Sequence, residues 1–89
     1  EQRLTVMPGN ATAEELERLM ADGGTVVIMK LSQCTDEVHR CIGRHPEYTY
    51  HYFENVGTPE EVYTCDTHRI AATKFLYFSL LIVQKAHPQ

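Results

Sequence analysis

Short apolar runs alternate with amphipathic stretches along this chain, which predicts strands separated by helices. Runs rich in β-branched and aromatic residues predict strands at residues 4–7, 25–31, 48–55 and 75–83. Leu16, Leu19 and Met20 recur on one helical face, so a helix is predicted over residues 12–22. As a helix, residues 75–83 would be apolar all round. Because so small a domain cannot surround such a helix, we interpret that run as a strand.

Capping and turn residues mark the ends of these elements. Thr12, with Glu15 three residues later, forms a capping box at the start of the first helix. Gly23-Gly24 ends that helix, since glycine adopts the left-handed conformation without steric cost. Pro8-Gly9-Asn10 predicts a turn after the first strand.

The stretches on either side of residues 48–55 are harder to interpret. Before them, capping and breaking residues predict a short helix of at most two turns between Thr35 and Gly43. After them, Thr58-Pro59-Glu60-Glu61 combines a capping threonine, a proline at the first helical position and a glutamate three residues after the cap. We therefore predict a second main helix from residue 58. The alternative is a β-hairpin that joins 48–55 to 61–66.

The resulting order is β-α-β-β-α-β, the arrangement of the ferredoxin-like fold. We expect an α+β two-layer sandwich, with a four-stranded antiparallel sheet and both helices on one face. A chain of 89 residues supports one hydrophobic core, so residues 1–89 are assigned to a single domain.

The last predicted strand is apolar on both of its faces. Alternate residues divide into one set of Leu76, Phe78, Leu80 and Ile82 and another of Phe75, Tyr77, Leu81 and Val83. One set should meet the helices. Since large apolar patches are uncommon on monomers, the other set should be covered by a partner, by a second copy of the chain, or by a segment of the chain that has no assigned element.

In layout the chain resembles an RNA-recognition motif. Leu4-Thr5-Val6-Met7 followed by Thr12-Ala13-Glu14-Glu15-Leu16 resembles its first strand and helix, and Tyr48-Thr49-Tyr50-His51-Tyr52-Phe53 is similar to the aromatic half of its third-strand motif. The resemblance implies a ferredoxin-like fold and single-stranded RNA binding. The chain departs from the motif where Thr5 replaces an aromatic residue and Pro46-Glu47 replaces a basic-glycine pair.

Aromatic side chains on the third strand are the main candidate contacts. A period of two places Tyr48, Tyr50 and Tyr52 on one face, where they would stack bases or anchor a protein. The alternative is that these rings pack in the core. With Tyr77 and Leu81 of the last strand, they form the predicted binding set.

Net charge and hydropathy argue against nucleic-acid binding and against a transmembrane segment. The chain has a net charge of −4, so it offers no basic field to attract phosphates, and RNA is a disfavoured partner. Its longest uncharged apolar stretch is about half of the roughly 20 residues that a transmembrane helix needs. A protein partner or a homodimer is therefore expected, and no membrane span.

Cysteine and histidine residues suggest two kinds of site. Cys34, His39, Cys41 and His45 carry the sulfur and nitrogen ligands that zinc prefers. Close CxxC or HxxxH pairs are lacking, so we predict no metal site, and no motif indicates a cofactor. The candidates for a disulfide are Cys34, Cys41 and Cys65.

Catalytic motifs are equally sparse. Cys65, Asp66 and His68, beside Cys41 and His45, are the residue types that pair a thiolate with a base. The chain carries no phosphate loop, GxSxG or HExxH. A non-enzymatic role is therefore the stronger expectation.

Three functions remain open from the sequence. The first is a module that binds a protein, or a second copy, through its sheet; the others are an RNA-binding domain and a small secreted effector with one disulfide. The sequence begins at Glu1 without methionine, which is compatible with either a processed chain or a domain of a longer one. The cellular location is therefore left open.

Overall fold

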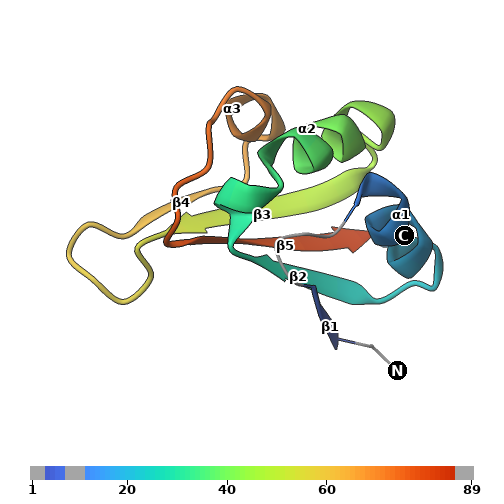
Figure 1. Ribbon diagram of the computed structural model, residues 1–89, viewed down its shortest axis with the longest axis horizontal. Helices are drawn as coiled ribbons and strands as arrows, with labels where there is room; N and C mark the ends of the chain where they lie inside the picture. Colours follow the sequence, from blue (N-terminus) through green and yellow to red (C-terminus); the bar gives the residue numbers. More distant parts are fainter. Residues whose placement is uncertain (1–3, 8–11, 86–89) are drawn as a thin grey trace.

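A computed structural model describes residues 4–7 and 12–85 of the chain. These residues form five strands, three α-helices and one turn of 3-10 helix, η1 (Figure 1). The elements are β1 (Leu4–Met7), α1 (Ala13–Ala21), β2 (Thr25–Met29), η1 (Leu31–Gln33), α2 (Thr35–Arg44), β3 (Tyr48–Glu54), β4 (Val62–Thr64), α3 (Thr67–Ala71) and β5 (Ser79–Lys85). The turn predicted at residues 8–10 lies outside the described residues.

The strands form one mixed sheet in the order β1-β2-β5-β3-β4. β1 runs parallel to β2, and every other neighbouring pair is antiparallel. The α+β class is confirmed. The four-stranded antiparallel ferredoxin-like sandwich is wrong, because β4 adds a fifth strand and β1 lies at an edge, parallel to its neighbour.

The structure has no helix at residue 58, where the second main helix was predicted to begin, and the reason is local. The Thr58 hydroxyl does bind backbone, but it donates to Asn55 O at 2.8 Å and accepts from Glu60 N–H at 3.2 Å inside a loop. Gly57 has a φ of +84°, which helps the chain turn back into a β-hairpin. The hairpin alternative is therefore the observed one, with β4 paired to β3.

A helix does follow β4, although it begins later and is short. The Asp66 carboxylate caps α3 by accepting hydrogen bonds from the backbone N–H groups of His68 and Arg69. Elsewhere, α2 is ten residues long rather than two turns, and the last strand starts at Ser79 instead of Phe75.

The local signals around α1 gave an accurate prediction. Thr12 and Glu15 form the capping box, and Gly23 takes a φ of +85° just after the helix ends. Leu16 and Met20 turn toward the sheet and are buried.

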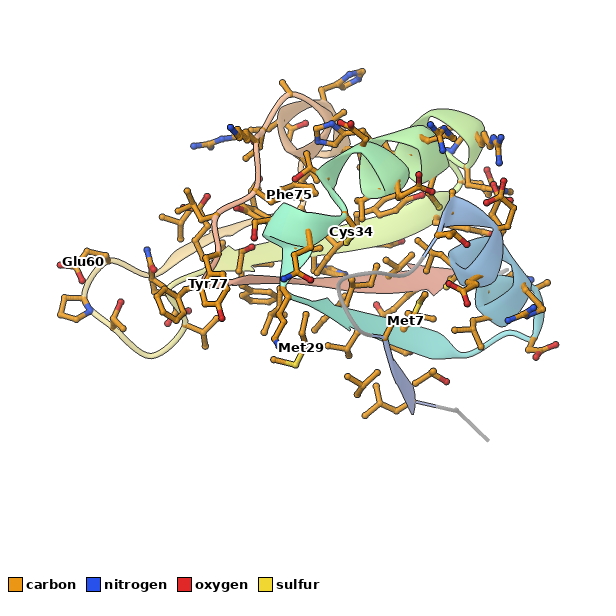
Figure 2. All side chains as sticks on the ribbon, in the orientation of Figure 1. Met7, Met29, Cys34, Glu60, Phe75 and Tyr77 are labelled. Carbon is orange, nitrogen blue, oxygen red and sulfur yellow. The ribbon has the colours of Figure 1, made fainter. Side chains whose placement is uncertain are left out.

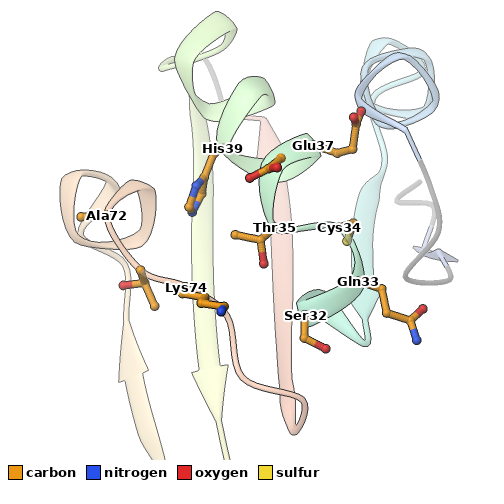
Figure 3. A pocket seen from close by; sticks show the side chains of 10 residues that line it. Ser32, Gln33, Cys34, Thr35, Glu37, His39, Ala72 and Lys74 are labelled. Carbon is orange, nitrogen blue, oxygen red and sulfur yellow. The ribbon is translucent and has the colours of Figure 1, made fainter.

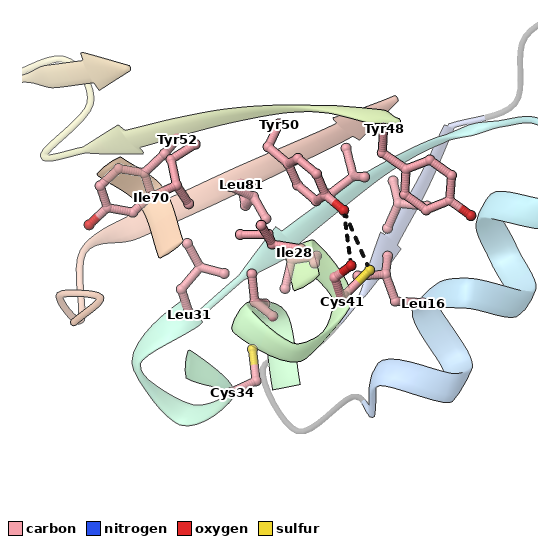
Figure 4. Packing of buried hydrophobic residues seen from close by; sticks show 14 of the residues in the cluster. Leu16, Ile28, Leu31, Cys34, Cys41, Tyr48, Tyr50, Tyr52, Ile70 and Leu81 are labelled. Atoms are coloured by element: carbon pink, nitrogen blue, oxygen red, sulfur yellow. Dashed lines mark hydrogen bonds between the residues drawn. The ribbon is translucent and has the colours of Figure 1, made fainter. Parts of the chain in front are cut away.

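All three helices lie on the same side of the sheet (Figure 1). Between the two layers, side chains of β3 and β5 meet those of α1, α2 and η1, as Figure 4 shows for Tyr50, Leu81, Leu16, Cys41 and Leu31. The opposite face of the sheet carries no helix among the described residues.

A carboxylate joins two of the helices. Glu37 of α2 accepts a hydrogen bond from the Ala13 N–H at 2.7 Å, in the first turn of α1. This bond lowers the pKa of Glu37, and Arg40, 3.0 Å away, acts in the same direction. Two effects thus favour the ionised form in the folded chain.

We predict that this contact contributes to acid sensitivity. Because the pKa of Glu37 is lower folded than unfolded, its contribution is present above the ordinary value of 4.5 and is lost as the pH falls through the folded value. Urea unfolding at pH 7 and pH 3 should therefore show a smaller loss of stability in Glu37→Gln than in the parent chain. Equal losses would contradict this role for Glu37.

Candidate binding face of the sheet

Alternation along the strands divides the sheet into a buried and an open face. On β3, Tyr48, Tyr50 and Tyr52 point toward the helices and are at most 7% exposed. On β5, Leu81 and Val83 do the same and are fully buried. The intervening residues of both strands therefore face away from the helices.

The register places the open-face residues in two rows that cross the sheet. The first row runs Val6, Val27, Ile82, His51, and the second runs Met29, Leu80, Phe53, Tyr63. Leu4, Thr25, Thr49 and Gln84 occupy the same face at one end of the strands. None of these twelve described residues is an aspartate, glutamate, lysine or arginine.

An uncharged open face is unusual for a sheet in water. Antiparallel sheets with one solvated face normally alternate apolar-in with polar-out residues. Here Leu4 and Val6 are 68% and 59% exposed, and Met29 and Tyr63 are about half exposed. This face, made by the twelve residues above, is hereafter the open face.

Three rings cluster at the β3–β4 side of the open face. Phe53 and Tyr63 lie 4.9 Å apart between ring centroids, and His51 stacks on Tyr63 at 6.0 Å. A hydrogen bond of 2.8 Å joins His51 Nδ1 to the Tyr63 hydroxyl. The cluster presents flat aromatic surface to solvent.

No family model matches this chain, and no curated protein sequence is significantly similar to it. The site is therefore interpreted from its own geometry. None of the helices in the described part of the chain has the length and hydropathy of a membrane-spanning segment.

The structure corrects much of the predicted binding set. Tyr48, Tyr50, Tyr52 and Leu81 are core residues and offer no surface to a partner, whereas Tyr77 is 58% exposed. The alternative interpretation of the tyrosines, as core, is the observed one. Sequence reasoning missed the open-face residues of β1, β2 and β4, although an alternate-residue reading of Leu4/Val6 and Val27/Met29 contains the signal.

The hydroxyl groups of two buried tyrosines form hydrogen bonds that help to hold the core together. The Tyr50 hydroxyl donates to His45 O at 2.9 Å. It also lies 3.7 Å from Cys41 Sγ (Figure 4). Burial raises the pKa of Tyr50 far above its ordinary value. Tyr52 donates to Glu54 Oε2 at 2.6 Å, and its pKa is also raised, chiefly by burial. Both hydroxyls therefore stay protonated and act as donors.

The candidate metal ligands are not brought together. Cys34 and His45 flank opposite ends of α2, and Cys41 lies in the core. His45 instead contacts Glu17 at 3.1 Å and Glu47 at 2.9 Å. Within residues 4–7 and 12–85, no group of three or more potential ligands could hold a metal ion.

A polar pocket of about 630 Å³ does lie beside Cys34 and His39 (Figure 3). Residues of η1 and the start of α2 form one wall, and Ala72, Thr73 and Lys74 form the other. The Nε2 atom of His39 is buried and has no hydrogen-bond partner within the described part of the chain, but the His39 ring packs edge-on against Phe75 at 5.1 Å. The ring therefore has a packing role.

All three cysteines are free thiols in this structure. Cys34 and Cys41 are buried, and burial raises the pKa of each, which disfavours the reactive thiolate. Cys65 is exposed, and its hydrogen bond with Tyr63 raises the pKa of that tyrosine. With Cys41 in the core and Asp66 capping α3, the cysteine, histidine and aspartate residues weighed for catalysis do not form one site.

Proposed function

We propose that this domain is a protein-binding module that packs its open face against the apolar surface of another chain. The observation that carries the proposal is the open face itself, which has two largely apolar rows and no charged residue. Placing such a surface in water is unfavourable by about 25 cal/mol per Å² of apolar area, and a partner removes that cost.

A second copy of the chain fits this face. Its strands are three to seven residues long, and with strands about 4.8 Å apart they give a flat area of roughly 400 Å². Two such faces, with the exposed aromatic side chains at their border, approach the roughly 1,000 Å² that a specific interface needs. We therefore expect a weak dimer, with a Kd of about 10 µM.

Charge favours the same pairing. Each copy carries a net charge of −4, so two copies repel when charged surfaces meet. Because the open face is uncharged, the copies can join there without placing like charges opposite one another. The acidic residues of α1 and α2 would remain on the outer, helical sides.

The experiment uses methyl NMR with a soluble paramagnetic agent. Val27 and Ile82 report on the open face, and Val62, 39% exposed on the other side of the sheet, is the control. On concentrating the protein, the Val27 and Ile82 methyl groups should become shielded while Val62 remains accessible. If the Val27 and Ile82 methyl groups are as accessible at millimolar protein as in dilute protein, pairing of the open faces is refuted.

RNA binding remains as a second candidate because of the cluster of His51, Phe53 and Tyr63. Such rings stack bases at about 1–3 kcal/mol each. However, single-strand binders combine stacking with a basic groove, and the open face lacks lysine and arginine. Titration with oligouridylate at low salt should therefore leave Phe53 and Tyr63 resonances unchanged. Shifts confined to these two rings would favour RNA instead.

A further inference from the structure

A groove of about 490 Å³ opens where β2 ends and β5 begins. Figure 2 shows two of its lining side chains, Met29 and Tyr77, at the same end of the sheet. The first residues of the β3–β4 loop, Asn55 and Val56, complete the wall. The volume lies within the range of about 300–1,000 Å³ that small-molecule sites occupy.

The walls of this groove are mainly apolar and exposed. Val56 and Tyr77 are 54% and 58% exposed, and Phe78 is 71% exposed, the largest value among the exposed large apolar residues described. The rings of Tyr77 and Phe78 pack edge-to-face, with their centroids 4.9 Å apart. Pockets of this composition bind ligands that bury hydrocarbon, and their few polar groups fix the orientation of the ligand.

The groove contains one charged residue, Lys30. Its ammonium group forms no ion pair with any described residue. The other polar lining residues, among them Asn55 and Ser79, are neutral. An unpaired cation beside apolar walls is complementary to a ligand with an apolar body and a negative end.

The backbone gives no reason for a lysine at this position. Lys30 has φ +56° and ψ +49°, a left-handed conformation that favours glycine or asparagine. Asn55, with φ +53°, is the only other non-glycine residue with positive φ in the described chain, and it also lines the groove. A residue that lines the groove thus has a backbone conformation that is unfavourable for lysine.

We propose that the groove binds an aliphatic carboxylate, such as a medium-chain fatty acid. The hydrocarbon lies against Met29, Val56, Tyr77 and Phe78, and the carboxylate pairs with the ammonium group of Lys30. The site differs from the proposed protein interface in its ligand, although Met29 and Leu80 border both. Because pairing of the open faces would cover these two residues, octanoate binding is also measured in a variant that does not dimerise.

The test compares octanoate, octanol and octylammonium by NMR, observed at the Met29 methyl group. Octanoate should bind at least tenfold more tightly than octanol, and octylammonium more weakly than either. Lys30→Met should remove the preference for octanoate and leave octanol binding unchanged. Lys74→Met is the matched control, because Lys74 lines the separate polar pocket, and it should keep the parent preference.

Three results with the parent chain and Lys30→Met would overturn the proposal. These are no shift of the Met29 methyl with millimolar octanoate, equal affinities for octanoate and octanol, or an unchanged octanoate preference in Lys30→Met. The titration is repeated in Ile82→Lys, a variant in which association of the open face is disrupted and whose changed residue does not line the groove. Retention of octanoate binding there separates the groove from the dimer, and loss of binding only there would reject an independent site.

Discussion

Replacing Tyr50 with alanine is expected to lower the free energy of unfolding by about 3–5 kcal/mol, the range for deleting a large buried aromatic side chain. Tyr50 is fully buried between the sheet and α2, and its hydroxyl satisfies the carbonyl of His45 at the end of that helix. Since domains of this size have roughly 5–10 kcal/mol of stability, the variant should be largely unfolded on mild heating.

Two control variants separate the causes of this loss. Tyr50→Phe removes only the hydroxyl and should cost about 1–2 kcal/mol, because the carbonyl of His45 loses one of its two donors and keeps the Tyr48 N–H at 3.2 Å. Tyr77→Ala removes an exposed ring and should change stability by no more than about 0.5 kcal/mol. Urea unfolding followed by circular dichroism measures all three. Similar losses for Tyr50→Ala and Tyr77→Ala would contradict the assignment of Tyr50 to the core.

The second large effect concerns association. Ile82 lies in the middle of the apolar row on the open face, between Val27 and His51 of the neighbouring strands. Ile82→Lys would place one ammonium group from each copy in the shared interface, where desolvation and like charge both oppose binding. We expect the dissociation constant to rise at least 100-fold, which corresponds to about 2.7 kcal/mol.

The matched control is Val62→Lys. Val62 lies on the edge strand β4, and its side chain is on the helical side of the sheet. It adds the same charge to the chain but leaves the open face unchanged, so it should dimerise like the parent. Circular dichroism should show both variants folded. An unchanged dissociation constant in Ile82→Lys, or an equal rise in Val62→Lys, would place the interface elsewhere.

Local sequence signals predicted the elements whose ends depend on neighbouring residues. Thr12, Glu15 and Gly23 fix the ends of α1 through contacts within a few residues, so the prediction was accurate. Thr58 shows the limit of such signals, because one hydroxyl can cap a helix or close a turn. Its actual role depends on the pairing of β4 with β3, which lies outside the capping motif.

The arrangement of strands depends on contacts between residues far apart in the sequence. β5 inserts between β2 and β3, and this leaves β1 at an edge beside β2 alone. The sequence indicated that the last strand has two apolar faces, and Leu81 and Ile82 do lie on opposite sides of β5. It placed Leu81 in the binding set, whereas Leu81 is buried against the helices and Ile82 faces away from them. It left the orientation of the Tyr50 face open, because Thr49 and His51 are compatible with either side of a sheet.

The most direct test of the proposed function is sedimentation equilibrium of the parent chain from about 1 µM to 1 mM, a range centred near the expected dissociation constant. We predict that the average mass rises from that of one 10.2 kDa chain toward twice that value. A constant mass of one chain up to 1 mM would contradict self-association through the open face.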